Sequence, residues 1–180
     1  IVGSHFPEVS QAVRAALHGD HIMVFDTDDV VGVEVASAFV GIVALAVGFA
    51  RGLGLGPGTL SVLTTRGIYE GARVASRLGG DVRTLGGLAG MADLVAVVAG
   101  DERPEERLGR AIAQGASPNA AIASLGTYVE GVLLLEHLLP WAERERVSLP
   151  ICHAVAGVLA GRLSPPRAVA ALMARRAGRE

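Results

Sequence analysis

The chain has 180 residues, of which 51% are apolar and only 19% are charged, and its formal net charge is −2. This balance excludes intrinsic disorder for most of the chain and suits one domain with a sizeable core. The pI of about 6.2 and the absence of a basic run exclude nucleic acid as an expected partner.

Two residue counts restrict the chemistry further. All 16 basic residues are arginine, which excludes a Schiff-base lysine, a P-loop lysine or a lysine proton donor within this polypeptide. Cys152 is the single cysteine, so an intrachain disulfide and a Cys-rich metal site are excluded and a reducing, cytoplasmic location is favoured. The histidines show no metal-ligand spacing, so no metal site is expected. The chain begins at Ile1 without a cationic n-region, and we expect no signal peptide and a piece of a longer product.

Residues 1–29 predict a linker with one short helix and one short strand. Apolar residues recur at helical spacing through residues 8–18. The apolar run 21–25 lies between Gly19-Asp20 and the polar residues 26–29, which predicts a strand that ends in a turn. Asp28 or Asp29 is expected to cap the helix that follows.

The next helix is predicted to be strongly apolar. Residues 35–50 carry no charge, yet these 16 residues fall short of the roughly 20 that a membrane-spanning helix needs. We therefore expect a helix that ends near Phe49 and is buried in an all-α core, with no membrane insertion. The alternatives are a membrane segment and a surface that a missing domain or subunit covers.

Residues 30–180 as a whole predict an all-helical domain. The glycine-rich segment 52–58 must be a loop. Thr59 is expected to cap a helix over residues 60–78, followed by a short helix at 82–85 and another from Met91.

The C-terminal half contains two clear helix starts. The charged stretch 100–107 predicts a surface loop that re-enters helix. Ser117-Pro118 and Ser164-Pro165 each combine an N-cap with a proline at the first helical position. The first of these helices is expected to end at Pro140 and the second near Arg176. The predicted fold class is all-α with one short N-terminal strand.

A series of short motifs carries a resemblance to a known family. The motifs are, in order, Gly32-Val33-Glu34, Gly52-Leu-Gly-Leu-Gly56, Thr65-Arg66-Gly67, Gly87-Leu-Ala-Gly90 with Asp93-Leu94, and Val129-Glu130-Gly131. The series resembles the C-terminal domain of NAD(P)-dependent glycerol-3-phosphate dehydrogenases, from about Gly3 to the end of the chain. The resemblance implies a multi-helix bundle of the 6-phosphogluconate dehydrogenase C-terminal-domain-like type. It also implies a homodimer and an N-terminal Rossmann domain, which these residues do not contain. NAD or NADP would be bound mainly by that missing domain, so no cofactor is expected on this chain alone.

The resemblance implies that the residues of the reaction are replaced. The family's G-A-x-K-N motif, whose lysine supplies a proton and stabilises charge, falls on residues 36–41. Val40 stands at the lysine position and Gly41 at the asparagine position, so no catalytic residue can be named. Valine can neither donate a proton nor stabilise an oxyanion.

The expected substrate-binding residues are also altered. The S-R-N motif, whose arginine binds the substrate phosphate, falls on Arg103-Pro104-Glu105. Arg103 and Arg107 remain candidates for a phosphate, and the alternative is that both are solvated partners of nearby carboxylates. Asp93 matches the family's substrate-side aspartate, and its alternative role is structural.

Other positions carry weaker expectations. Glu130 matches a cofactor-side glutamate of the family, and a structural role at a helix start is equally open. Arg66 and Glu70 lie at i, i+4 and are expected to pair within one helix, with Glu34 as another possible partner of Arg66. Arg51 replaces an aspartate and reverses a charge at the edge of the site.

Three functions stay open. The first is the substrate and dimerisation domain of a glycerol-3-phosphate dehydrogenase-family protein, which reduces dihydroxyacetone phosphate by resemblance but is catalytically impaired here. The second is a non-catalytic binding or dimerisation module derived from that family. The third is a dehydrogenase of the same superfamily with a substrate that lacks phosphate. The sequence leaves open whether the chain is an enzyme, and this chain alone is predicted to be inactive.

Overall fold

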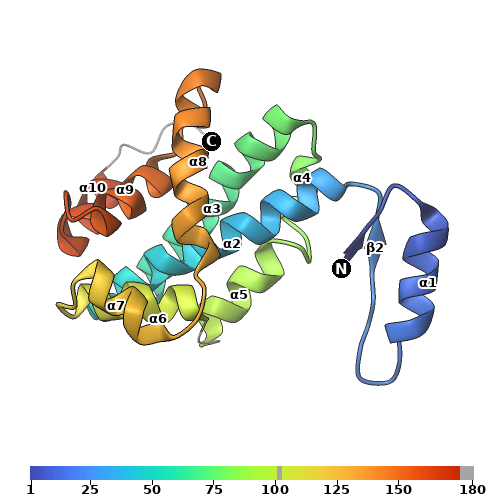
Figure 1. Ribbon diagram of the computed structural model, residues 1–180, viewed down its shortest axis with the longest axis horizontal. Helices are drawn as coiled ribbons and strands as arrows, with labels where there is room; N and C mark the ends of the chain where they lie inside the picture. The colour runs from blue at the N-terminus through green and yellow to red at the C-terminus, as the bar shows by residue number, and fades with distance from the viewer. Residues whose placement is uncertain (101–102, 175–180) are drawn as a thin grey trace.

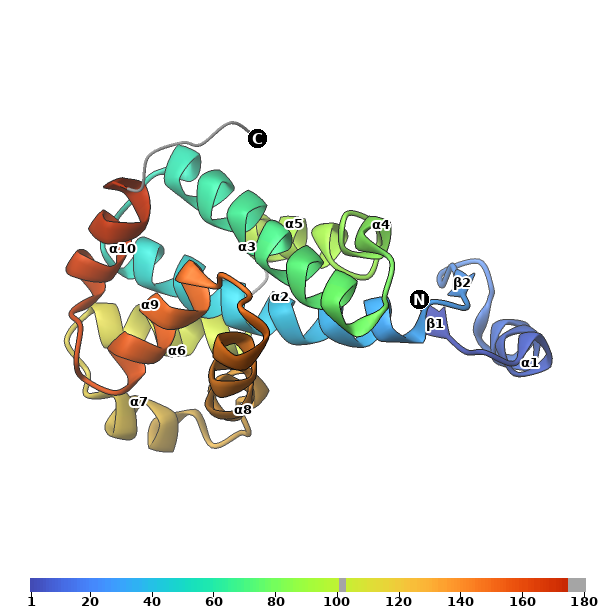
Figure 2. The ribbon, with the colours of Figure 1, turned by 90° about the horizontal axis from the view of Figure 1, so that it is seen from above.

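The computed structural model describes residues 1–100 and 103–174, and these form a mostly helical molecule with one small parallel sheet (Figures 1 and 2). The elements are β1 (Val2–Gly3), α1 (Pro7–Leu17), β2 (Asp26–Thr27), α2 (Val30–Gly52), α3 (Pro57–Leu78), α4 (Val82–Leu85), α5 (Met91–Ala99), α6 (Pro104–Ala113), α7 (Pro118–Leu125), α8 (Glu130–Glu145), α9 (Pro150–Leu159) and α10 (Pro165–Ala174). The predicted all-α fold class is confirmed. The expected end of the last helix, near Arg176, lies outside the described residues.

Helix α2 is the centre of the molecule, and the other helices of the body surround it (Figure 2). It begins where the sequence predicts, because the Asp29 carboxylate accepts a hydrogen bond of 2.9 Å from the Gly32 N–H. By length and mean hydropathy, 2.4 over its most apolar stretch, α2 could cross a membrane. Most of its side chains are instead buried against α3, α6, α8 and α9, so protein packing accounts for its apolar character.

Helix α6 crosses α2 at a pair of glycines. A Cβ atom at Gly48 would collide with the Glu106 carbonyl oxygen and lie 2.9 Å from the Gly109 Cα, and one at Gly109 would collide with the Leu45 carbonyl oxygen. The two backbones therefore approach more closely than any side chain allows. This close contact holds α6 against α2.

The N-terminal strand is a correction to the sequence analysis. The structure has two strands, β1 and β2, which pair in parallel, with Val2 opposite Asp26 and Gly3 opposite Thr27. Residues 21–25 lie just before β2 and contribute only an isolated bridge between Gly19 and Ile22. Helix α1 connects the two strands, so β1–α1–β2 is a βαβ unit, which we call the N-terminal unit. The sequence did not reveal β1 because a two-residue strand carries no periodicity.

The start of α3 also differs from the prediction. Helix α3 begins at Pro57 with Gly56 as its N-cap, not at Leu60 with Thr59 as its cap. Proline at the first helical position has a fixed φ that suits a helix start, and it precedes the threonine.

The helix expected over residues 118–139 is two helices. Gly126, with φ of 63°, ends α7, and α8 begins at Glu130 and continues through Pro140 to Glu145. Proline removes one backbone hydrogen bond to the residue four positions before it. That residue is the exposed Glu136, whose carbonyl oxygen can bind water instead, so Pro140 does not end the helix.

Candidate functional site

The two positions that the resemblance assigns to the reaction lie midway along α2. The Val40 side chain is fully buried, with 0% of its surface exposed, so it packs in the core. Gly41, the next residue, is half-buried. Its missing side chain leaves a space that two other helices border, and this space is the centre of the candidate site.

The first turn of α6 borders this space. Pro104 is the first residue of α6 and Glu105 the second. The Glu105 Cγ and Oε1 atoms each lie 3.6 Å from the position that a Cβ atom at Gly41 would take. A carboxylate therefore stands next to the two replaced positions on α2.

The start of α8 borders the same space from another side. A Cβ atom at Gly131 would lie 3.3 Å from the Gly41 carbonyl carbon, so the two backbones are in close contact. Glu130, the residue before, is the exposed first residue of α8. The fold therefore brings residues of the 36–41, 103–105 and 129–131 motifs together.

Asp93 and Arg103 form an ion pair. The Arg103 Nη2 atom lies 2.9 Å from the Asp93 Oδ2 atom, and the two side chains are 30% and 46% exposed. The sequence had offered Asp93 as a substrate candidate and Arg103 as either a phosphate ligand or a partner of neighbouring carboxylates. The structure pairs the two candidates with each other across the α5–α6 connection. The carboxylates expected as partners were Asp101, Glu102 and Glu106. Residues 101 and 102 lie outside the described residues, and Glu106 is buried and paired with Arg51 and Arg110 instead. Arg107 is exposed on α6.

The sequence analysis missed a buried charge cluster next to this site. Glu106 is 0% exposed, and its carboxylate accepts hydrogen bonds from Arg51, at 3.4 Å, and from Arg110, at 2.8 Å. Arg51 also donates to the Val98 carbonyl oxygen at 2.7 Å. Arg51, which the resemblance places at the edge of the site, is therefore paired with Glu106 inside the molecule, together with Arg110. The i, i+4 spacing of Glu106 and Arg110 was a signal that could have indicated half of it.

The expected pair of Arg66 and Glu70 is wrong. Arg66 donates to the Leu172 carbonyl oxygen at 2.6 Å and thereby ties α3 to α10. Glu70 is buried and accepts hydrogen bonds from the backbone N–H groups of Ile151, at 2.6 Å, and Cys152, at 3.2 Å. Glu70 thus caps the start of α9 from a neighbouring helix, because the first N–H groups of a helix have no partner within it.

Burial shifts the pKa values of the two side chains at this contact, Glu70 and Cys152. Burial raises the pKa of Glu70, although the two hydrogen bonds from α9 and the nearby Arg73 lower it in part. Burial, followed by the proximity of Glu70, raises the pKa of the Cys152 thiol well above its usual value. Cys152 is therefore a buried, unreactive thiol.

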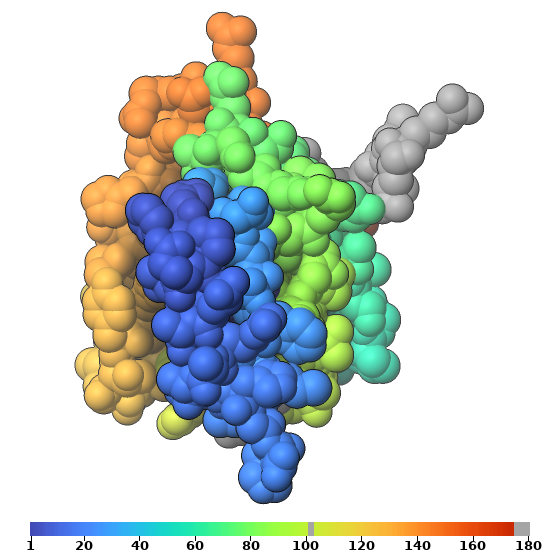
Figure 3. All heavy atoms as spheres, turned by 90° about the vertical axis from the view of Figure 1, so that its right-hand side faces the viewer, coloured from blue at the N-terminus to red at the C-terminus, as the bar shows by residue number. Residues whose placement is uncertain are grey.

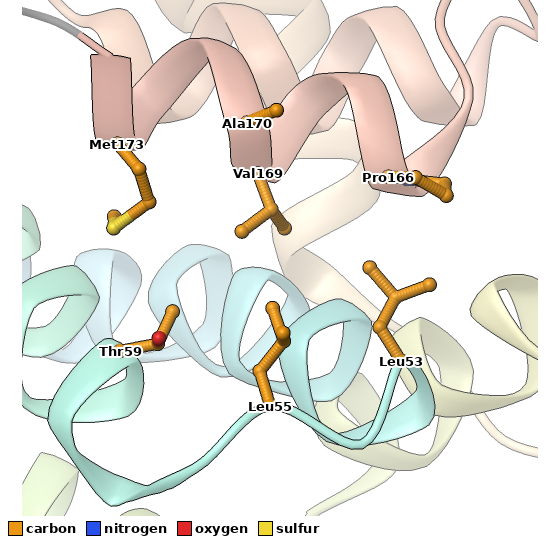
Figure 4. A pocket seen from close by; sticks show the side chains of 7 residues that line it. All are labelled: Leu53, Leu55, Thr59, Pro166, Val169, Ala170 and Met173. Atoms are coloured by element: carbon orange, nitrogen blue, oxygen red, sulfur yellow. The ribbon is translucent and has the colours of Figure 1, made fainter.

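A separate apolar groove lies between α10 and the loop after α2 (Figure 4). It has a volume of about 410 Å³, and its lining residues are Leu53, Leu55, Thr59, Pro166, Val169, Ala170 and Met173. No motif position of the candidate site lines it. Within residues 1–100 and 103–174, no group of three or more His, Cys, Asp or Glu side chains comes together to hold a metal ion.

Comparison with known proteins supports the resemblance. The family described as NAD-dependent glycerol-3-phosphate dehydrogenase C-terminus matches residues 29–170. The glycerol-3-phosphate dehydrogenase of Leptothrix cholodnii is 41% identical over 180 residues, which cover 100% of this chain and 53% of that protein. The Polaromonas enzyme is 38% identical over 175 residues, or 97% of this chain and 50% of that protein.

Solved structures agree with the sequence comparison. The crystal structure of glycerol-3-phosphate dehydrogenase from Coxiella burnetii superposes with a TM-score of 0.91 at 32% identity, over 96% of this chain and 53% of that one. The yeast enzyme, with a TM-score of 0.77 at 22% identity, shares the fold. The chain spans about half the length of the relatives it matches. On this evidence the chain belongs to the NAD-dependent glycerol-3-phosphate dehydrogenase family and matches its C-terminal domain.

Proposed function

We propose that this chain is the substrate-side and dimerisation domain of a glycerol-3-phosphate dehydrogenase-family protein whose reduction of dihydroxyacetone phosphate is impaired. An N-terminal Rossmann domain would bind NAD or NADP, and the whole protein would be a cytoplasmic homodimer. The named activity of the family members supports the reaction class. The residues around Gly41 support the impairment.

The N-terminal unit supports the proposed Rossmann partner. Two parallel strands of two residues each are too short to be stable alone. The unit exposes large apolar side chains, including Phe6 at 62%, Met23 at 74% and Phe25 at 49%. A parallel sheet is normally covered on both faces, so these side chains fit burial against further strands and helices of a preceding domain.

Reduction of the substrate ketone needs a proton donor and charge stabilisation at its oxygen. In the family this is the role of the lysine that falls on Val40, and here that position carries an aliphatic side chain buried in the core. The chain contains no lysine that could substitute for it. The oxygen would therefore have no cationic partner at position 40 of α2.

The position of Glu105 carries the proposal. Its carboxylate lies against the space at Gly41, where the family places an asparagine, and next to Pro104, where the family places a phosphate-binding arginine. A carboxylate repels a phosphate dianion, and the repulsion is strong because Glu105 is half-buried. Both requirements of the reaction, proton supply and phosphate binding, would thus be lost at one place.

A second candidate is a dehydrogenase for a substrate without phosphate. The half-exposed Asp93–Arg103 pair favours it, because this pair keeps hydrogen-bonding groups at the site while its charges balance. A raised melting temperature with 2-oxo or 2-hydroxy compounds that lack phosphate would support this candidate. No shift with any of them, together with a stable dimer, would support the non-catalytic module.

The test is the oxidation of NADH or NADPH with dihydroxyacetone phosphate by the full-length protein, with the Coxiella burnetii enzyme as the active control. Removal of one charge-stabilising group typically costs about 10²–10³ in rate. We expect turnover at least about 100-fold below a median enzyme rate of roughly 10 per second. Turnover within about tenfold of that median would contradict the proposed impairment.

A further inference from the structure

Asp29 lies at the junction between the N-terminal unit and the helical body. Strand β2 ends at Thr27, and α2 begins at Val30. In Figures 1 and 2 the N-terminal unit stands apart from the body at the first turn of α2. Figure 3 shows it in front, with α8 on one side and the α4–α5 region on the other. The angle between the two parts therefore depends on this junction.

The Asp29 carboxylate joins α2 and α4. It accepts hydrogen bonds from the Gly32 N–H at 2.9 Å, from the Asp81 N–H at 3.0 Å and from the Thr84 hydroxyl at 2.6 Å. The first bond caps α2, and the other two hold α4. The Thr27 hydroxyl oxygen also accepts a hydrogen bond from the Asp29 N–H at 3.2 Å, which ties the end of β2 to the same residue.

The packing around this carboxylate is close. A Cβ atom at Gly80 would lie 2.9 Å from the Gly32 backbone nitrogen, and one at Gly32 would collide with the Asp29 carboxylate. The turn before α4 therefore rests directly on the first turn of α2. Few other contacts hold the N-terminal unit, and Gly3 provides one of them beside Val30 and Val33.

We infer that Asp29 is a positioning residue that fixes the angle between the N-terminal unit and the helical body by locking the start of α2 to α4. After α4, the chain leads through residues 86–90 to α5, which carries Asp93. Asp29 thus links the end of β2, through its backbone N–H, to the segment that leads to the Asp93–Arg103 pair, through its carboxylate. That this angle sets the cofactor-binding half against the substrate site rests on the proposed function.

The charge of Asp29 suits this role. Burial raises the pKa of Asp29, but the hydrogen bonds from Thr84, Gly32 and Asp81 together lower it by more. The pKa of Asp29 therefore lies below its ordinary value. The carboxylate is therefore ionised at neutral pH. Hydrogen bonds to a charged acceptor are stronger than those between neutral groups.

The test measures the angle directly as a distance between spin labels in the 180-residue chain. Nitroxides attached at Gln11→Cys on α1 and Ser76→Cys on α3 occupy exposed positions, and the buried Cys152, 1% exposed, remains unlabelled. We expect one narrow distance distribution for the parent protein. Thr84→Val removes one bond of the junction but leaves the α2 cap intact, and we expect it to broaden and shift the distribution.

Two further variants complete the experiment. Asp29→Asn is expected to broaden the distribution more than Thr84→Val, and Thr65→Val, at an exposed position on α3, is expected to leave it unchanged. A lower melting temperature with an unchanged distance distribution in Thr84→Val would show a merely structural role and overturn the inference. If Asp29→Asn fails to fold, Thr84→Val decides. The measurement uses no substrate or cofactor, so its result is independent of the proposed reaction.

Discussion

The Glu105 side chain faces Gly41, because its Oε1 atom lies 3.6 Å from the place that a Cβ atom at Gly41 would take. The Glu105 carboxylate on α6 lies next to the place that a side chain at position 41 of α2 would occupy. Restoration of the family motif on α2 alone would therefore set the new asparagine against Glu105. We predict that Val40→Lys with Gly41→Asn gains little activity in the full-length protein, and that addition of Pro104→Arg and Glu105→Asn gains more. The rate of NADH oxidation with dihydroxyacetone phosphate compares the two sets, and equal activity would show that Glu105 does not oppose the substrate.

Val40→Lys should be costly by itself. The side chain at this position is fully buried, and an uncompensated buried charge typically costs about 3–5 kcal/mol. We expect a free energy of unfolding lower by that amount in urea titration, whereas Ser37→Lys, at an exposed position of the same helix, should change it little. A Val40→Lys protein as stable as its parent would mean that an ammonium group at this position reaches solvent.

Glu106→Gln tests the buried cluster with Arg51 and Arg110. The substitution keeps the shape of the side chain but removes the negative charge that both partly buried arginines contact. Because the arginines retain some exposure, we expect a loss at the lower end of the range for a broken buried pair, about 3 kcal/mol. Glu136→Gln, exposed on α8, is the matched control and should fall within about 0.5 kcal/mol of the parent. Equal losses in the two variants would contradict the cluster's role.

Glu70 should make stability depend on pH in a defined direction. Its pKa in the folded protein is raised above the ordinary 4.5, so the folded state holds this proton more tightly than the unfolded chain does. The protonated Glu70 side chain therefore contributes to the free energy of unfolding fully below pH 4.5, and this contribution is lost as the pH rises through the raised pKa. In urea titrations from acid to neutral pH, the parent should lose stability relative to Glu70→Gln, and Glu143→Gln should show no such trend. A relative gain as pH rises would mean that the hydrogen bonds from α9 outweigh burial.

Cys152 should resist thiol reagents in the native protein. Burial and the raised pKa leave little accessible thiolate at pH 8. We expect the native chain to react with a disulfide reagent only after urea is added, whereas Ser37→Cys should react at once with one equivalent. Rapid reaction of the native parent would show that the contact between α3 and α9 opens frequently.

The sequence predicted those elements whose signals are local. Three predictions were confirmed: Asp29 as a cap, Pro118 and Pro165 as first helical residues, and the burial of most of residues 35–50. Each depends on nearby residues or on a long apolar run. The end of α7 was missed because Gly126 adopts a left-handed conformation that its neighbours do not announce. Strand β1 was missed because two residues form a strand only through the partner 24 positions later.

The roles of the candidate site residues stay predictions, and their contacts could not be predicted from the sequence. The motifs indicated Asp93, Arg103, Glu105 and Glu130, and the structure gathers their segments around α2. The pairing of Asp93 with Arg103 depends on the path of the α5–α6 connection, which the sequence does not specify. The burial of Glu106 was unexpected because the stretch 100–107 is rich in charge. Hydrogen bonds from Arg110 and from Arg51 on α2 compensate the buried carboxylate there.

The glycine crossing of α2 and α6 bears on how such a domain can change over evolutionary time. Gly48 lies seven residues after Gly41, about two helical turns away. At Gly48 even a methyl group would strike the opposing backbone, so drift at that point threatens folding. A Cβ atom at Gly41 would first meet the Glu105 side chain, which can be exchanged, so the chemistry at this position can change or be lost while the fold that carries it persists.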